Sequence, residues 1–446
     1  MASAARNASL ALATLPSETK HAILHAMANA LRTHRAAIEE ANAKDIATAK
    51  DNNLATPLLK RLGFSGAKID EAVDGLLALS ELPEGVGRIL AKRELSPGLI
   101  LEQVTCPLGV IGVIFESRPD ALIQISALCL KSGNAVLLKG GSEAKHTNRI
   151  LTEILHDASV TAGAPVGWMQ LLETRADVAE MLSLDDLIDL IIPRGSNEFV
   201  RHIMENSRIP VMGHADGICH LYVDDAADID MAVNLTIDSK TQYVAVCNAL
   251  ETLLVHEKIA PAFLERLGRA TVSRLAAQQT VARLGEDAFA LPSGASPHTA
   301  IELRGCPRTC AILPDCTPAT DADWDTEYLD YILSIKIVDS LDEAIDHINR
   351  HGSGHTDAIV TTDTATAETF LNRVDSANVF WNASTRFADG FRYGLGAEVG
   401  ISTSKIHARG PVGLEGLLIY KWKLRGSGDT VAPFASGERR FTHRPL

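Results

Sequence analysis

Residues 109–139 read GVIGVIFESRPDALIQISALCLKSGNAVLLK, and this stretch decides the fold class. Gly109 to Phe115 is a short apolar run typical of a buried strand, Leu122 to Lys131 has helical periodicity, and Asn134 to Lys139 resembles a second buried strand. Strand and helix patterns continue to alternate as far as Ile192. Such alternation predicts an α/β fold with a helix-covered parallel sheet, whose ligand is expected at the carboxyl ends of the strands.

The flanking segments extend this organisation in both directions. Residues 1–80 are expected to be helical, and residues 85–105 have the pattern of β-strands. A second alternating block starts near Thr236, and Val412 to Lys423 resembles one extended strand. Leu291 to Pro297 is rich in turn residues and is expected to be an exposed loop.

Composition narrows the classes of function. The 446 residues carry a formal net charge of −14, and 46% are hydrophobic, which suits two or three domains with their own cores. The excess of acidic over basic residues argues against a nucleic-acid-binding protein. Seven cysteines without regular spacing indicate reduced thiols. Since no apolar run has the length of a transmembrane helix and no secretory signal is recognisable, we expect a cytoplasmic protein.

Cys247 is the candidate nucleophile. It follows the polar and aromatic stretch Thr241 to Val246 and precedes an apolar segment rich in Leu and Val. A reactive thiolate needs an exposed or electropositive setting, and Asn248 could present its amide or backbone N–H to an oxyanion. The alternative is a buried structural cysteine, because free cysteines are among the most buried residues.

Two short segments could bind a nucleotide. Lys139 ends a strand beside Gly140-Gly141, and Gly195-Ser196 joins a strand to a helix whose free N–H groups could meet a pyrophosphate. A solvated lysine and an ordinary turn are the alternatives. No G-x-G-x-x-G fingerprint follows the first strands, so a standard Rossmann site is not supported.

Three histidines, His347, His351 and His355, have a spacing that resembles metal-ligand spacing. Glycines would interrupt a helix between them, so structural or substrate-contacting roles are favoured and no metal site is predicted. Three cysteines lack the paired spacing of a zinc ribbon and are expected to be ordinary thiols: Cys306, Cys310 and Cys316. A Gly-rich region contains three arginines that could bind a phosphate or a carboxylate: Arg386, Arg392 and Arg409. The alternative is that these arginines are surface charges that keep the protein in solution.

Together these motifs resemble the aldehyde dehydrogenase superfamily, and within it the gamma-glutamyl phosphate reductase family, over nearly the whole chain. The resemblance rests mainly on the segments 109–120, 137–143, 191–196, 247–256, 343–359, 391–400 and 407–413. It implies a parallel-sheet cofactor domain (residues 1–235, with strands at 88–105 in a β oligomerisation arm) and an α/β catalytic domain (236–400). Residues 401–446 would return to the cofactor domain and add an oligomerisation strand.

The resemblance also implies a reaction: NADPH-dependent reduction of L-glutamyl 5-phosphate to glutamate 5-semialdehyde, with release of phosphate, through a cysteine thioester. This is the second step of proline biosynthesis from glutamate. By position, Cys247 matches the catalytic thiol and Lys139 the lysine of the adenosine ribose and 2′-phosphate. Gly195 and Ser196 match the pyrophosphate turn, and Glu327 matches the glutamate of the nicotinamide ribose. The candidates for substrate contact are Ser117, Arg118, Arg386 and Arg392.

One departure from the superfamily favours the reductase. Aldehyde oxidisers carry a water-activating Glu where this chain has His214-Ala-Asp-Gly217. An acyl-phosphate reductase has no use for that base, since water would destroy its thioester. The alternatives are an aldehyde-oxidising dehydrogenase, a non-catalytic binding protein and a reductase of another acyl phosphate. The expected partners are a second copy of the chain, in a dimer or tetramer, and a separate glutamate 5-kinase, but neither nucleic acid nor membrane.

Overall fold

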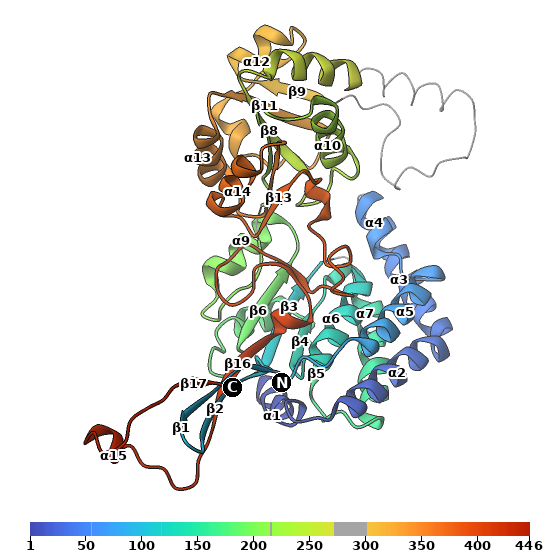
Figure 1. The fold of residues 1–446 in the computed structure, drawn as a ribbon. Coiled ribbons are helices and arrows are strands. Elements are labelled where there is room, and N and C mark those ends of the chain that lie inside the picture. Colours follow the sequence, from blue (N-terminus) through green and yellow to red (C-terminus); the bar gives the residue numbers. More distant parts are fainter. Residues whose placement is uncertain (55, 117, 215, 272–300) are drawn as a thin grey trace.

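The computed structural model describes residues 1–54, 56–116, 118–214, 216–271 and 301–446, so Ser117 and the predicted loop Leu291 to Pro297 lie outside the described residues. The first unit is built on a four-stranded sheet with the order β5-β4-β3-β6, in which every pair is parallel (Figure 1). Its strands are β3 (Val110–Phe115), β4 (Ala135–Lys139), β5 (Met169–Leu171) and β6 (Leu190–Arg194).

Helices of this unit cover the sheet, and all six residues of β3 are therefore buried. The helices of this unit, of which α2, α3 and α4 pack on other helices, are α1 (Ala2–Leu12), α2 (Ser17–Thr33), α3 (Arg35–Asp51), α4 (Thr56–Leu62), α5 (Ala67–Glu81), α6 (Pro119–Lys131), α7 (Lys145–Thr161), α8 (Arg175–Met181) and α9 (Asn197–Asn206), with the short 3-10 turn η1 (Ser142–Ala144). The helical N-terminus and the helix-covered parallel sheet predicted from the sequence are confirmed.

The second unit contains a seven-stranded parallel sheet with the order β10-β9-β11-β8-β7-β12-β13. Its strands are β7 (Cys219–Val223), β8 (Leu250–His256), β9 (Glu302–Gly305), β10 (Thr317–Pro318), β11 (Ile332–Val338), β12 (Thr356–Val360) and β13 (Asn378–Trp381). Around them lie α10 (Ile229–Thr241), α12 (Pro307–Ile312), α13 (Leu341–His351), α14 (Thr364–Arg373) and the 3-10 turns η2 (Asp321–Asp325) and η3 (Thr385–Phe387).

Strand pairing indicates where one domain ends and the next begins. Because β7 pairs with β8 and β12, it belongs to the second sheet although it precedes residue 236. A boundary between residues 235 and 236 would also cut α10. Sheet membership therefore favours a boundary ahead of β7.

A twisted antiparallel sheet with the order β16-β2-β1-β17 projects from the end of the first unit that lies away from the second unit (Figure 1). It consists of β1 (Ile89–Ser96), β2 (Leu99–Pro107), β16 (Leu418–Arg425) and β17 (Arg444–Pro445), and the short helix α15 (Ala432–Ala435) follows β16. The predicted single strand Val412 to Lys423 is wrong in its first half. The structure has β14 (Gly400–Ser402), β15 (Gly410–Val412) and the 3-10 turn η4 (Leu414–Leu417) before β16, because Leu414 and Leu417 turn into the first core.

The two units present opposite edges of their sheets to the region between them. Lys139 and Arg194 stand at the carboxyl ends of β4 and β6, whereas Cys247 and His355 immediately precede β8 and β12. In the first sheet the strand order reverses between β3 and β6, which is the place where open parallel sheets bind ligands. Within the described ranges, no helix combines the length and apolarity needed to cross a membrane.

Candidate active site

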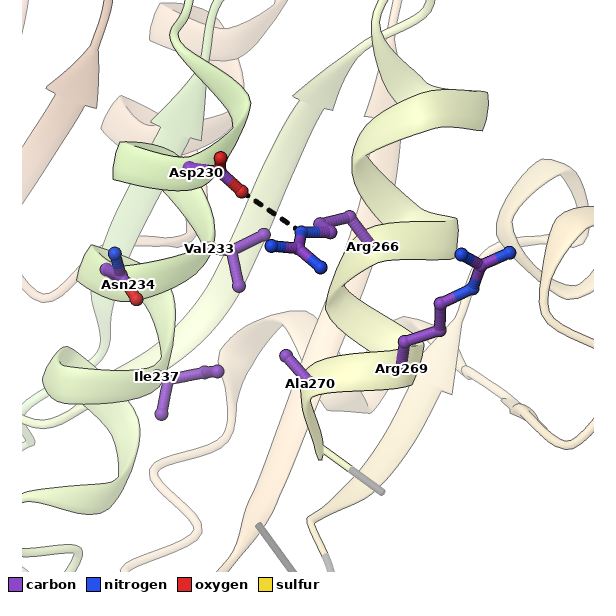
Figure 2. Close-up of a pocket in the computed structure, with 7 residues that line it drawn as sticks. All are labelled: Asp230, Val233, Asn234, Ile237, Arg266, Arg269 and Ala270. Carbon is purple, nitrogen blue, oxygen red and sulfur yellow. Dashed lines mark hydrogen bonds and ion pairs between the residues drawn. The ribbon is translucent and has the colours of Figure 1, made fainter. Parts of the chain in front are cut away.

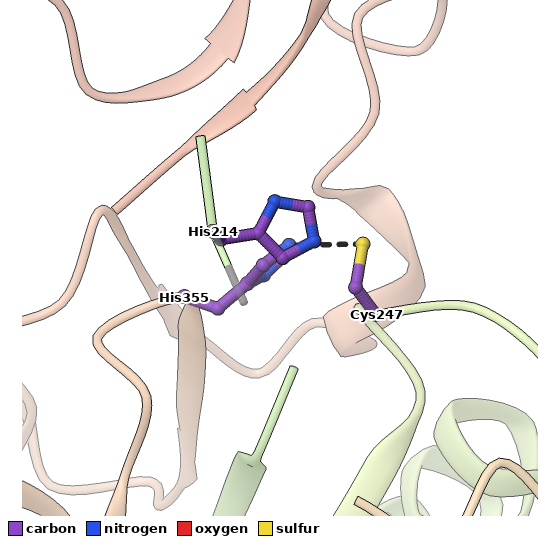
Figure 3. Close-up of side chains that lie close together, drawn as sticks. All are labelled: His214, Cys247 and His355. Carbon is purple, nitrogen blue, oxygen red and sulfur yellow. Dashed lines mark hydrogen bonds between the residues drawn. The ribbon is translucent and has the colours of Figure 1, made fainter. Parts of the chain in front are cut away.

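Cys247 is half-buried in the loop that leads into β8. Its Sγ lies 3.2 Å from Nε2 of His355 (Figure 3). The backbone of Cys247 is closely confined, because Cys219 Sγ donates to its carbonyl oxygen at 3.2 Å and a Cβ on Gly217 would come within 2.2 Å of the same oxygen. A thiol held beside an imidazole nitrogen is the arrangement of an activated nucleophile.

Two histidines face this thiol, and each is oriented through its other ring nitrogen. The buried His355 has Nδ1 2.8 Å from Thr356 Oγ1, which in turn accepts a hydrogen bond from Asn378 Nδ2 at 3.2 Å. His214 Nδ1 donates to the carbonyl oxygen of Ile401 at 3.0 Å, and the two rings meet edge to face at 5.1 Å between centroids. Burial lowers the pKa of His214, so its imidazole is neutral at neutral pH and its Nε2 carries a lone pair.

Asn248 lies beside the thiol, but its side chain points into a neighbouring loop. Its Nδ2 donates to the carbonyl oxygen of Ala388 at 2.8 Å, and Thr385 Oγ1 donates to the Asn248 carbonyl oxygen at 2.8 Å. The Asn248 amide nitrogen is therefore used to hold residues 384–388 beside Cys247. This arrangement favours a positioning role for Asn248 over direct contact with an oxyanion.

Two arginines bring positive charge to the thiol. Burial lowers the pKa of Arg194 and repulsion from Arg118 lowers it further, while Glu398, Asp120 and, more weakly, Cys247 attract its charge. Burial likewise lowers the pKa of Arg386, whose Nε donates to Gln242 Oε1 at 2.9 Å, and this guanidinium is also attracted by Cys247. Because arginine stays protonated in proteins, a desolvated guanidinium at this site favours an anionic ligand.

The other predicted arginines are engaged differently. Arg392 is exposed, and its Nη1 donates to the carbonyl oxygen of Arg386 at 2.7 Å, which supports the loop rather than the thiol. Arg118 is exposed at the start of α6, close enough to Arg194 to repel its charge. Arg409 forms an ion pair with Asp375 at 3.0 Å.

The residues predicted to bind the cofactor lie at the carboxyl edge of the first sheet. Ser196 occupies the N-cap position of α9, and its backbone N–H donates to Glu116 Oε2 at 3.1 Å. A Cβ on Gly195 would come within 2.7 Å of that same carboxylate oxygen. In this structure the Gly195-Ser196 turn therefore binds the negatively charged Glu116 carboxylate. It offers a backbone N–H donor and, at Gly195, room for an anion to approach the backbone closely, and a pyrophosphate requires both.

Glu327 reaches this turn from the second unit. Asn197 Nδ2 donates to Glu327 Oε2 at 2.6 Å and to Asp216 Oδ1 at 3.0 Å, so one amide joins α9 to two segments of the catalytic side. Lys139 lies at the end of β4, where its Nζ donates to the carbonyl oxygen of Gly140. Lys139 and Ser196 therefore stand at the carboxyl edge of the first sheet, and Glu327 meets the start of α9 from the second unit.

The remaining predicted clusters do not join the thiol. Burial lowers the pKa of His347 to about 2, and its Nδ1 lies 3.1 Å from Lys336 Nζ. His351 Nδ1 lies 2.8 Å from Asp325 Oδ1. A separate hollow between α10 and the helical residues 260–271 contains the ion pair of Asp230 and Arg266 and no side chain of the thiol site (Figure 2).

Several site residues were not predicted from the sequence. The sequence places His355 with His347 and His351 in structural or substrate-contacting roles, whereas the structure places its Nε2 3.2 Å from Cys247 Sγ. Arg194 and Asn197 directly flank the predicted Gly195-Ser196 turn, and that adjacency is the signal that could have identified them. No local signal connects His214 or Glu116 to the residues that they face.

Comparison with known proteins identifies the family of this chain. The model of the aldehyde dehydrogenase family matches residues 1–283 and 276–397. A gamma-glutamyl phosphate reductase from Pelotomaculum thermopropionicum is 58% identical over 441 residues, which cover 99% of this chain and 96% of that protein. The crystal structure of gamma-glutamyl phosphate reductase from Thermotoga maritima matches with a TM-score of 0.88 and 37% identity, covering 96% of this chain and 98% of that chain.

A more distant match shows the fold alone. Glyceraldehyde-3-phosphate dehydrogenase from Methanocaldococcus jannaschii, solved in complex with NADP, has a TM-score of 0.63 and 18% identity, covering 96% of this chain and 93% of that chain. The fold class and the family predicted from the sequence are confirmed. The chain belongs to the aldehyde dehydrogenase family of oxidoreductases, and its near relatives within that family are gamma-glutamyl phosphate reductases.

Proposed function

We propose that this protein reduces L-glutamyl 5-phosphate to glutamate 5-semialdehyde with NADPH and releases phosphate, which is the second step of proline biosynthesis from glutamate. The observation that carries the proposal is the 3.2 Å contact between Cys247 Sγ and His355 Nε2, with the Arg194 and Arg386 charges nearby. A thiol, a base and cations suit attack on an anionic acyl donor. The names of the near relatives supply the identity of that donor.

In the first step His355 Nε2 accepts the thiol proton while Nδ1 donates to Thr356 Oγ1. The sulfur attacks the acyl carbon, the S–C bond forms, and the bond from the acyl carbon to the phosphate oxygen breaks. Phosphate leaves with both electrons and takes a proton from solvent. Arg194 and Arg386 stabilise the negative charge that develops beside the thiol.

The nicotinamide cofactor, when bound, supplies a hydride to the thioester carbon. The tetrahedral oxyanion then collapses to the aldehyde, the C–S bond breaks, and the released thiolate recovers its proton from His355. The neutral His214 stands where aldehyde oxidisers carry a water-activating carboxylate, and its Nδ1–H is committed to the Ile401 carbonyl oxygen. A poorly basic, hydrogen-bonded imidazole limits hydrolysis of the thioester.

The residues present fit a dinucleotide. Gly195 allows backbone approach, Ser196 N–H already pairs with a carboxylate, and α9 directs its amino end at the turn. We propose that Gly195 and Ser196 hold the pyrophosphate and that Lys139 contacts the adenosine ribose and its 2′-phosphate. Glu327, oriented by Asn197, would accept hydrogen bonds from the nicotinamide ribose. Glu116 must leave the turn before a phosphate can replace it.

The arm supports a homo-oligomer. β16 is an edge strand, and it exposes large apolar side chains, among them Tyr420, Trp422 and Leu424. An exposed apolar edge strand is a surface for pairing with another chain. We propose a dimer or tetramer built through this arm, a cytoplasmic location, and a separate glutamate 5-kinase as the source of the labile acyl phosphate.

The reverse reaction tests the proposal. Glutamate 5-semialdehyde and NADP are supplied with and without phosphate, and absorbance of the reduced cofactor is followed. We expect cofactor reduction to depend strictly on phosphate and to be lost in Cys247→Ala. Reduction of NADP without phosphate would instead identify a hydrolytic aldehyde dehydrogenase and contradict the role given to His214.

A further inference from the structure

The catalytic thiol lies beside two imidazoles that contact each other and come from different parts of the chain (Figure 3). His214 precedes β7, Cys247 precedes β8 and His355 precedes β12, and one ligand atom of each lies within 4.8 Å of the other two (Figure 3). We propose that these three side chains form a binding site for a thiophilic divalent cation, Zn²⁺ above all, and that occupancy of this site switches the enzyme off.

The distances suit a tetrahedral cation. Zinc bonds of about 2.3 Å to sulfur and about 2.0 Å to nitrogen place the sulfur and nitrogen atoms of a tetrahedral site about 3.5 Å apart. Cys247 Sγ and His355 Nε2 are 3.2 Å apart, so this pair is already close to the required spacing. The ligand atoms of the whole set lie within 4.8 Å of one another, so a tetrahedral cation requires the wider pairs to approach by no more than about 1.3 Å.

The outer contacts of the histidines orient the correct atoms. His214 uses Nδ1 to bond the Ile401 carbonyl oxygen, and His355 uses Nδ1 to bond Thr356 Oγ1. In each histidine, Nε2 is therefore the ring nitrogen that faces the thiol. Metal-binding histidines are typically held in this way, with one ring nitrogen on a carbonyl or hydroxyl and the other on the ion.

The ligand set also favours one class of ion. One thiolate and two neutral imidazoles select Zn²⁺ or similar thiophilic ions over Mg²⁺ and Ca²⁺, which prefer oxygen. Cys219 is not a fourth ligand, since its thiol donates to the Cys247 carbonyl oxygen and burial raises its pKa well above the usual range. Among the residues that the structure describes, the set has three protein ligands, and a fourth position would be open to water.

Binding would stop catalysis by a simple exchange. The cation takes the place of the thiol proton, which leaves to solvent, and the sulfur lone pair that would attack the acyl carbon is shared with the metal. His355 Nε2 is occupied by the same ion and can no longer accept a proton. This consequence rests on the proposed function, whereas cation binding itself does not.

Cobalt spectroscopy of the full chain tests the binding without any turnover. Co²⁺ added to the reduced, metal-free protein should give a thiolate-to-cobalt charge-transfer band with one equivalent bound, and Zn²⁺ should displace it. Cys247→Ser should abolish the band. His214→Gln should weaken Co²⁺ binding. Thr356→Val removes the hydroxyl that contacts His355 Nδ1 and Asn378 Nδ2, and it should weaken binding by about 10- to 100-fold.

A second histidine cluster provides the matched control. His21, His25 and Glu81 also bring ligand atoms within 4.8 Å of one another, but without a thiol and partly exposed to solvent. His21→Ala should leave the charge-transfer band and its midpoint unchanged. A band that survives Cys247→Ser, or one insensitive to both His214→Gln and Thr356→Val, would overturn the site.

Activity separates this inference from the proposed function. In the phosphate-dependent assay, Zn²⁺ should inhibit at the concentration that displaces Co²⁺, and a chelator should restore the rate. An active enzyme that Zn²⁺ does not inhibit refutes the switch and leaves the reductase intact. A protein that gives the cobalt band but shows no phosphate-dependent turnover refutes the reductase and leaves the cation site standing.

Discussion

Gly217→Ala should inactivate the enzyme without unfolding it. A Cβ at this position would lie 2.2 Å from the carbonyl oxygen of Cys247 and 2.4 Å from its Cα. Both are backbone atoms, so no flexible side chain can move aside to relieve the clash. Restoring an ordinary contact distance requires the Cys247 backbone to move by about 1 Å. A misplacement of that size costs about 100-fold in rate, which corresponds to about 2.7 kcal/mol of transition-state stabilisation.

The assay is the phosphate-dependent reduction of NADP by glutamate 5-semialdehyde, with thermal unfolding followed in parallel. Gly213→Ala is the matched control, because it lies in the same segment and its Cβ would meet nothing closer than Pro193 Cγ at 3.4 Å. We expect kcat to fall by about 100-fold in Gly217→Ala and by less than about threefold in the control. Equal losses in the two variants, or full activity in Gly217→Ala, would show that the confinement of Cys247 is not what sets its reactivity.

Three further predictions concern the thiol, the substrate anion and acid stability. His355→Asn should lower kcat/KM by about 100-fold or more and slow alkylation of Cys247 at neutral pH. His351→Asn, which alters contacts with Asp325 and His347 and none with the thiol, should do neither. Arg194→Met should raise the KM for phosphate in the reverse reaction by about 10- to 100-fold, whereas Arg149→Met, on the surface beside Glu173, should leave it unchanged. Burial opposes ionisation of Asp323, but hydrogen bonds from Tyr328 and Arg304 outweigh it and hold the pKa of Asp323 well below its usual value of 3.8. Because the pKa of Asp323 is lower in the folded than in the unfolded protein, its ionised carboxylate stabilises the fold at pH values above the unfolded-state pKa. The Tm should therefore fall as the solution is acidified below about pH 4, and Asp323→Asn should flatten that part of the profile of Tm against pH. An unchanged profile in Asp323→Asn would contradict the assignment.

The first sheet could be predicted from the sequence because its strands are short apolar runs between helical segments. β3, β4 and β6 all lie within or beside the predicted ranges, since strands buried on both faces carry few polar residues. The tail was harder, because Val412 to Lys423 is apolar enough to resemble a strand throughout. Only tertiary packing shows that Leu414 and Leu417 turn into the first core while β16 continues in the arm.

The candidate site was predictable to the extent that its residues occupy recognisable segments. Cys247 and the Gly195-Ser196 turn were identified because a thiol between a polar stretch and an apolar strand, and a Gly-Ser before a helix, have local signatures. The partner of the thiol had none, since His355 lies 108 residues away and reaches Cys247 only because β12 and β8 both pair with β7. Asn248 illustrates the opposite case, because adjacency to the nucleophile suggested contact with an oxyanion while its amide bonds Ala388.

The opposed sheet edges have a consequence for how such an enzyme can diversify. The nucleophile and its base stand on the amino edge of one sheet, whereas the residues suited to the dinucleotide stand on the carboxyl edge of another. If Lys139 contacts the adenosine ribose as proposed, substitutions around it should alter the preference between nicotinamide cofactors and leave the loop before β8 untouched. Substitutions in that loop should likewise leave cofactor preference unchanged. The shared constraint is the hydrogen bond of Asn197 to Glu327, which couples the two halves. Directed evolution of cofactor choice and of acyl specificity can therefore proceed in separate libraries, with Asn197 and Glu327 held constant in both.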